Sequence, residues 1–221
     1  MRDVIAIDGP SGVGKSTVAR LLARRLGWTY LDTGAMYRTV TLAWMHSGTE
    51  SPTYNDPQWL DALDLDFQEE RIYLDGTEVG DAIRAPEVSA RVSEPAACPR
   101  VRAHLTDMQR RIAGKRPCIL DGRDIGTVVF PDAFFKVFLK ASARVRAERR
   151  WLQMGGEAAA QTLDEVQRDL EARDRADSSR ETAPLRQAED AFAVDTDRHS
   201  VEGVVDLLET EARRRLNARG A

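Results

Sequence analysis

The chain has 221 residues, 42% of them hydrophobic and 31% charged, which is typical of a globular protein and excludes a fibrous or disordered one. Its length favours one domain with an inserted subdomain over two full domains. The formal net charge is -4, so no overall positive field would draw the chain to nucleic acid or to an anionic membrane. No segment approaches ~18 consecutive apolar residues, and the N-terminal segment lacks the apolar stretch of a signal peptide, so we expect a cytoplasmic protein.

The first part of the chain alternates between strand and helix signals. Residues 4–7 are a short apolar run that ends in a glycine-rich segment, which predicts a buried parallel strand followed by a loop. A helix should follow, ending near Gly27, because its apolar positions have helical spacing: Val18, Leu21, Leu22 and Leu26. Residues 29–31 predict a second strand, and residues 35–46 predict a second helix.

The pattern changes between residues 64 and 113. Short apolar runs flank Asp75-Gly76, which is a hairpin signal. Helical stretches at residues 86–98 and 99–113 follow it. We therefore expect a small inserted α+β subdomain at residues 64–102, which leaves residues 1–63 and 103–221 as the core.

The alternation resumes after this insert. Strands are predicted at residues 118–121, 135–139 and 192–195, and helices at residues 143–154, 163–177 and 201–216. Strands that alternate with helices imply a parallel sheet covered by helices on both faces. The predicted fold class is therefore α/β.

A phosphate-binding motif follows the first predicted strand. Residues 9–16 match G-x-x-x-x-G-K-[ST], with a strand before and an amphipathic helix after, as the motif requires. Backbone N–H groups would cradle the β-phosphate of a nucleoside triphosphate at the helix N-terminus, Lys15 would bridge the β- and γ-phosphates, and Ser16 would offer its hydroxyl to Mg²⁺. The fold is thus predicted to be of the P-loop NTPase type. The expected nucleotide-binding residues are Gly9, Pro10, Ser11, Gly12, Val13, Gly14, Lys15, Ser16 and Thr17.

A second polar segment follows the strand at residues 118–121. Asp121 ends this strand at the carboxyl edge of the sheet, where ligands bind in open α/β sheets. It is placed like a carboxylate that holds Mg²⁺ through water, and Arg123 could reach the phosphate of an acceptor. A surface Asp-Gly turn is the alternative interpretation. A GTPase switch is weakly supported, because the chain has no N-K-x-D guanine reader.

Two further charged clusters lie near predicted helix ends. Arg38 lies one turn into the helix that begins after the second strand, and residues 173–180 place several arginines and two carboxylates at the end of another helix. A solvated charged face is the usual meaning of such a run. Arginine forks that grip phosphate oxygens are the functional alternative.

Together these motifs resemble bacterial cytidylate kinases in their order and rough spacing over nearly the whole chain. The most specific part is the run D-G-R-D-I-G-T-V-V-F-P at residues 121–131. Two departures are small: Thr33 stands where the family has Ser, which keeps the hydroxyl of a substrate-binding residue, and Ala176 stands where another charge is expected.

The resemblance implies roles for individual residues. It implies that Arg38, Arg123 and Arg180 bind the CMP phosphate. It implies that Ser93, Arg102 and Asp124 read cytosine, and that Arg173 and Asp177 hold the ribose. Residues 64–102 resemble the family's monophosphate-binding insert, and an ATP lid at about residues 143–180 would begin with Arg146, Arg149 and Arg150.

The chemistry of the base agrees with these implied roles. Cytosine presents an amino donor at N4 and acceptors at N3 and O2, so a carboxylate, an arginine and a hydroxyl complement it. Uracil would leave Asp124 facing an acceptor. We therefore expect transfer of the γ-phosphate of ATP to CMP or dCMP, with Mg²⁺, by a monomer that binds neither nucleic acid nor membrane.

Two rival functions stay open at this point. One is a P-loop kinase for another small acceptor, such as AMP, dTMP or shikimate. The other is a nucleotide-dependent regulatory or RNA-binding module that uses its arginines as an electrostatic surface. The acidic balance of the chain speaks against the second.

Overall fold

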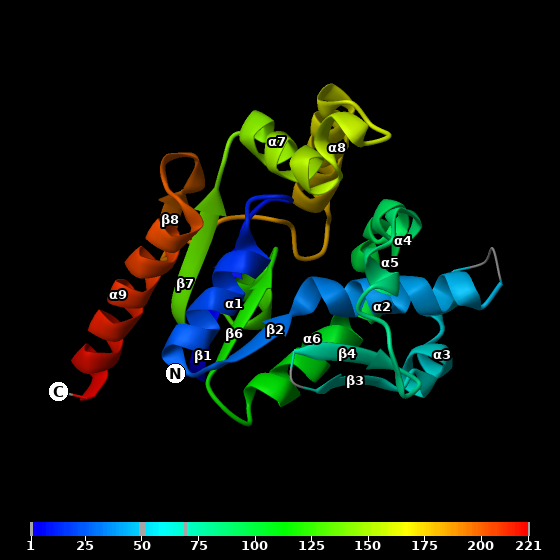
Figure 1. Cartoon of the computed structure of the whole chain (residues 1–221). Coiled ribbons are helices and arrows are strands. Elements are labelled where there is room, and N and C mark those ends of the chain that lie inside the picture. Colours follow the sequence, from blue (N-terminus) through cyan, green and yellow to red (C-terminus); the bar gives the residue numbers. More distant parts are fainter. Residues whose placement is uncertain (1, 49–51, 69, 221) are drawn as a thin grey trace. The chain divides into compact units, whose positions relative to one another are not determined.

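The computed structural model describes residues 2–48, 52–68 and 70–220 (Figure 1). The chain forms two compact units. The first contains residues 1–30 and 116–221, and the second contains residues 31–115. The predicted insert at residues 64–102 lies within the second unit, and its role in binding a monophosphate stays a prediction.

The first unit is built on a five-stranded sheet with the order β2-β6-β1-β7-β8. Its strands are β1 (Arg2–Asp8), β2 (Thr29–Asp32), β6 (Cys118–Gly122), β7 (Ala133–Lys140) and β8 (Phe192–Asp195). The pairs β1–β6, β1–β7 and β7–β8 are parallel, which confirms the predicted parallel sheet. Because Ile7 pairs with Asp121, β1 and β6 end at the same edge, and Asp8 and Asp121 both lie there.

Four long helices belong to this unit: α1 (Lys15–Leu26), α7 (Ala143–Gln153), α8 (Leu163–Ser179) and α9 (Val201–Gly220). The predicted apolar stripe of α1 is confirmed, since Val18 and Leu22 pack in one core with Phe135 of β7 and Leu208 of α9. Gly27 ends α1 in the left-handed conformation, as predicted. Helices α7 and α8 share a smaller core.

The second unit combines helices with a small antiparallel sheet. Its helices are α2 (Thr33–His46), α3 (Pro57–Ala62), α4 (Pro86–Arg91), α5 (Ser93–Ala97) and α6 (Pro99–Ala113), and its strands are β3 (Leu65–Gln68), β4 (Arg71–Leu74) and β5 (Thr77–Glu78). Asp75 and Gly76 both have positive φ between β4 and β5, so the predicted hairpin turn is confirmed. Met36, Trp44 and Leu105 are among the core residues.

Several details differ from the sequence expectation. The helical stretch at residues 86–98 is divided into α4 and α5, because Pro95 has no N–H to donate and its ring would clash with the carbonyl four residues earlier. Helix α3 and a π-helical turn, Ile125–Val129, were not predicted. Short 3₁₀ turns lie at Thr53–Asn55, Ala82–Arg84, Gly156–Ala158 and Thr196–Arg198.

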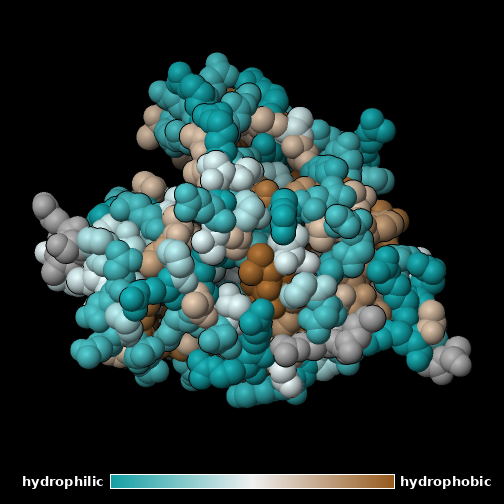
Figure 2. All heavy atoms as spheres, turned by 180° about the vertical axis from the view of Figure 1, so that it is seen from behind, coloured by the Kyte–Doolittle hydropathy of each residue, from teal (hydrophilic) through white to brown (hydrophobic). Residues whose placement is uncertain are grey.

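Polar side chains dominate the face shown in Figure 2, where hydrophobic colour is confined to small areas. Among the described residues, no helix combines the length and the apolar character needed to cross a bilayer.

Candidate active site

The phosphate loop joins β1 to α1 through glycines in unusual conformations. Gly9, Gly12 and Gly14 all have positive φ, which L side chains rarely adopt. A Cβ atom on Gly9 would lie 2.5 Å from the carbonyl oxygen of Leu139 on β7, so no other residue fits there without moving the strand. The loop therefore has the strand–loop–helix geometry that presents backbone N–H groups to an anion.

Lys15 is the first residue of α1 and is almost fully buried. Its Nζ donates to the carbonyl oxygen of Pro10 at 2.7 Å, so the side chain folds back over the phosphate loop. Burial and the nearby charge of Arg123 lower the pKa of Lys15, while Asp121 acts in the opposite direction. Lys15, the one lysine of the loop, thus lies near both a positive charge, Arg123, and a negative charge, Asp121.

Ser16 and Asp121 form an oxygen-rich pair at the end of β6. Ser16 Oγ donates to Asp121 Oδ2 at 3.0 Å, and Tyr30 Oη donates to Asp121 Oδ1 at 2.9 Å. Both oxygens of this buried carboxylate are therefore oriented. A hydroxyl and a carboxylate are hard oxygen donors that suit Mg²⁺, which needs few protein ligands when phosphates supply the others. Within the described part of the chain, no group of three or more His, Cys, Asp or Glu side chains forms a self-sufficient metal site.

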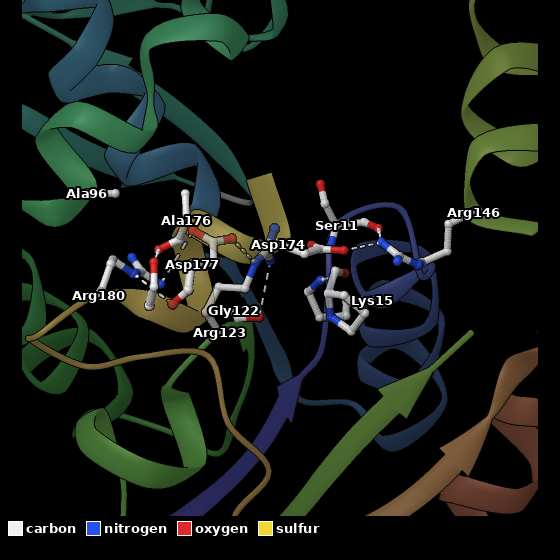
Figure 3. Close-up of polar contacts among 12 residues, drawn as sticks. Ser11, Lys15, Ala96, Gly122, Arg123, Arg146, Asp174, Ala176, Asp177 and Arg180 are labelled. Atoms are coloured by element: carbon white, nitrogen blue, oxygen red, sulfur yellow. Dashed lines mark hydrogen bonds and ion pairs between the residues drawn. The ribbon is translucent and has the colours of Figure 1, made fainter. Parts of the chain in front are cut away.

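Asp177 on α8 joins two arginines (Figure 3). Arg123 Nε donates to Asp177 Oδ2 at 2.8 Å, and Arg180 Nη2 lies 3.5 Å from Asp177 Oδ1. Burial alone would raise the pKa of Asp177, but Arg123, Arg180 and Arg173 outweigh it and leave that pKa below its ordinary value. Asp177 thus orients the guanidinium groups of Arg123 and Arg180, and guanidinium groups are well suited to bind phosphate oxygens.

Asp174, one turn before Asp177, connects the α7–α8 pair with the phosphate loop (Figure 3). Its Oδ1 accepts the backbone N–H of Ser11 at 2.9 Å, and its Oδ2 pairs with Arg146 of α7. Arg146 Nη1 in turn donates to the Ser11 carbonyl oxygen at 2.8 Å. Of the three predicted lid arginines, the structure brings Arg146 to the loop.

The other two lid arginines lie elsewhere. Arg149 donates to the Thr196 hydroxyl and carbonyl at 2.9 and 2.8 Å, and Arg150 is exposed. Asp124, a predicted base reader in the first unit, is buried just before the π-helical turn. Arg173 is half-buried on α8 and acts electrostatically on both Lys15 and Asp177.

The remaining predicted substrate residues belong to the second unit. Arg38 on α2 donates to Ser89 Oγ at 2.7 Å and to the Ile83 carbonyl at 3.4 Å. Arg102 on α6 donates to the Ala96 carbonyl at 3.1 Å and lies over the ring of Tyr37. Thr33 is buried at the start of α2, and Ser93 begins α5. Their contacts with a substrate stay predictions.

Three residues that contact the phosphate loop or the residues around it are not among those predicted from the sequence: Tyr30, Asp174 and Asp8. Tyr30 is concealed in an apolar strand, and Asp174 lies in a charged run that could be a solvated face. Asp8 carries the clearest sequence signal of the three, because a carboxylate that ends an apolar strand directly before a phosphate loop is expected to be buried.

Comparison with known proteins gives a consistent result. A family model described as "Cytidylate kinase" matches residues 5–214. The cytidylate kinase of Fervidobacterium nodosum is 46% identical over 92% of this chain and 93% of its own length. That of Dichelobacter nodosus is 43% identical over 95% of this chain and 96% of its own length.

A solved structure supports the fold alone. The crystal structure of an uncharacterized protein from Eubacterium ventriosum superimposes with a TM-score of 0.53 at 12% identity, covering 96% of this chain and 98% of that one.

Proposed function

Because this chain belongs to the cytidylate kinase family, we propose that it transfers the γ-phosphate of ATP to CMP or dCMP, giving CDP or dCDP and ADP. It would act in pyrimidine nucleotide metabolism, in the cytoplasm and as a monomer. The observation that carries the proposal is that the phosphate loop contacts α8 through Ser11 and Asp174, and that the buried Lys15 of this loop lies within electrostatic reach of Arg123, which pairs with Asp177.

The chemistry is a direct in-line displacement. An oxygen of the CMP phosphate attacks the γ-phosphorus, the bond to the β–γ bridging oxygen breaks, and ADP leaves with that electron pair. The attacking oxygen is already anionic near pH 7, so we assign no general base. Lys15 and the arginines lower the barrier by aligning the two phosphates and neutralising their charge.

Ser16 and Asp121 are the residues that would hold Mg²⁺, since their oxygens lie 3.0 Å apart at the edge where the phosphate loop begins. The ion would supply charge neutralisation on the transferring phosphate. Tyr30 and Ser16 keep the carboxylate of Asp121 oriented for this task.

The residues proposed to bind the acceptor are those that the family resemblance implies. Arg38, Arg123 and Arg180 would bind its phosphate, Arg173 and Asp177 its ribose, and Ser93, Arg102 and Asp124 its base, with Thr33 adding a hydroxyl. On the ATP side, residues 9–17 would hold the phosphates, with Arg146, Arg149 and Arg150 of the lid.

An acceptor panel tests the proposal. The purified protein is supplied with ATP, Mg²⁺ and one of CMP, dCMP, UMP, AMP, dTMP or shikimate in a coupled assay of ADP formation. We expect turnover with CMP and dCMP to exceed turnover with UMP by roughly ten- to a hundred-fold, because uracil leaves a buried polar group unpaired. Faster turnover with AMP, dTMP or shikimate would overturn the assignment.

A further inference from the structure

Asp8 is a buried carboxylate for which the proposed mechanism has no use. It ends β1 and directly precedes Gly9, the first residue of the phosphate loop. Its Oδ1 accepts the backbone N–H of Ile125 at 2.9 Å, and its Oδ2 accepts that of Gly126 at 2.7 Å. Both oxygens therefore bind one short segment that lies more than a hundred residues further along the chain.

That segment is the start of the π-helical turn Ile125–Val129. The first N–H groups of a helical turn have no acceptor within it, so Asp8 satisfies two of them at once. The turn immediately follows Arg123 and Asp124, two of the proposed acceptor-binding residues. By holding the first two backbone amides of this turn, Asp8 therefore also constrains the backbone of Arg123 and Asp124.

Gly126 shows how closely the turn approaches Asp8. A Cβ atom at this position would lie 3.3 Å from Asp8 Oδ2 and 3.3 Å from the side chain of Lys136. Such a separation is tighter than most Cβ contacts, so a side chain at this position would require Asp8 or Lys136 to move by a few tenths of an ångström. Asp8 and Gly126 are therefore in close, complementary contact.

Burial of Asp8 disfavours its charged form. Burial raises the pKa of Asp8 to about 7, although the N–H groups of Gly126 and Ile125 and the charge of Lys15 oppose the rise, and Asp124 adds to it. Asn has nearly the same shape as Asp and would avoid the free-energy cost of burying a charge. Asn, however, has one acceptor oxygen and would turn its amide N–H₂ toward one of the two donors.

We propose that Asp8 is a positioning residue that fixes Arg123 and Asp124 relative to the phosphate loop, and so aligns the acceptor nucleotide with the γ-phosphate. The inference rests on the proposed function, because alignment has meaning only if two nucleotides react. An Asp8 variant should therefore lose activity toward the acceptor nucleotide but keep its affinity for ATP, since the phosphate loop retains its glycines and Lys15.

The test compares Asp8→Asn with a matched control, Asp3→Asn. Asp3 lies on the same strand, is exposed, and its ion pair with Arg219 at 3.0 Å contributes little to stability. ATP affinity is measured by calorimetry, and kcat and KM for CMP and UMP by the coupled assay. For Asp8→Asn we expect kcat/KM for CMP to fall ~10- to 100-fold, a smaller ratio of CMP to UMP turnover, and ATP affinity within ~2-fold of the parent protein, while Asp3→Asn stays unchanged.

A second variant covers the case in which Asp8→Asn does not fold. Gly126→Ala crowds the same contact through its other partner and keeps the carboxyl group of Asp8, so it should give the same loss of kcat/KM for CMP. The inference is overturned if the folded variant weakens ATP binding as much as CMP turnover, or if it changes neither. If the parent protein and Asp3→Asn do not phosphorylate CMP, it is the proposed function that fails.

Discussion

Lys15 is the residue at which removal of a single charge should be most costly. It is buried beside Asp121 and Arg123, and it is the only lysine of the phosphate loop. We expect Lys15→Ala to lower kcat by at least ~100-fold, the scale of loss seen when one charge-stabilising donor is removed. Circular dichroism and the melting temperature should show an intact fold. Lys115→Ala, an exposed lysine, is the control, and normal turnover in folded Lys15→Ala would contradict the assignment.

Asp124 should decide between pyrimidine bases. Its carboxylate is buried, and its proposed role is to accept from the N4 amino group of cytosine; uracil presents an acceptor at that position, a mismatch that costs about 1–3 kcal/mol. We therefore expect Asp124→Ala to narrow the ~10- to 100-fold preference for CMP over UMP, as measured by kcat/KM for both acceptors. An unchanged ratio would mean that other residues read the base.

Residues within one contiguous motif could be predicted, whereas their long-range partners could not. The phosphate loop and Asp121 were found because a strand and a loop specify them locally. Tyr30, which orients Asp121, lies 91 residues away from it, and Asp174 lies 163 residues from the Ser11 amide that it binds. Neither contact can be predicted from the local sequence pattern, because residues so far apart in the chain meet only when the sheet is assembled.

At the scale of elements, the parallel strands and long helices were predictable because their apolar periodicity is strong. The failures lie where a short-range constraint overrides that periodicity. Pro95 divides a helical stretch into α4 and α5, and the turn Ile125–Val129 is π-helical in a segment without helical spacing. That turn depends on acceptors supplied by Asp8, which belongs to a different element.

The junction between β1 and the phosphate loop should not tolerate a side chain. Gly9→Ala would place a methyl group 2.5 Å from the Leu139 carbonyl at a φ of +152°. We expect a destabilisation of roughly 1–3 kcal/mol or more from strain, with a large loss of ATP affinity, measured by urea denaturation and calorimetry. Gly80→Ala is the control, since its Cβ atom would meet nothing closer than 3.8 Å and its φ is not positive. Equal behaviour of the two variants would contradict this account of the loop.

For the whole molecule, two buried carboxylates give stability opposite dependences on pH. The pKa of Asp177 is lowered in the folded state, so its contribution is present above its unfolded pKa near 3.8 and is lost as the pH falls through the folded value. The pKa of Asp8 is raised from 3.8 to about 7. Its contribution is therefore complete below pH 3.8 and is lost as the pH rises through about 7.

Urea denaturation between roughly pH 3 and pH 9 measures both slopes. The free energy of unfolding should rise out of the acid range, decline as the pH rises from 3.8 toward about 7, and level off above that value. Asp8→Asn has no charge to titrate and should flatten the decline, whereas Asp3→Asn should retain it. An identical decline in Asp8→Asn would assign it to other groups.

The order of the strands could not be predicted from the sequence, because β6 pairs with β1 only after a long excursion of the chain. The chain leaves the sheet at β2 and returns at its neighbour β6, and the backbone N–H of Thr29 donates to the Pro117 carbonyl at 3.0 Å. The departure and return points of residues 31–115 are thus tied together.

A segment whose two ends are adjacent in the sheet can change in length or sequence at a small cost in stability, because the entropy of loop closure grows slowly with length. Substitutions at residues such as Arg38 and Arg102, which are proposed to bind the acceptor, can therefore accumulate while the strand that precedes the phosphate loop keeps its neighbours in the sheet. One ATP-binding scaffold could in this way be retained while its phosphate acceptors diversify.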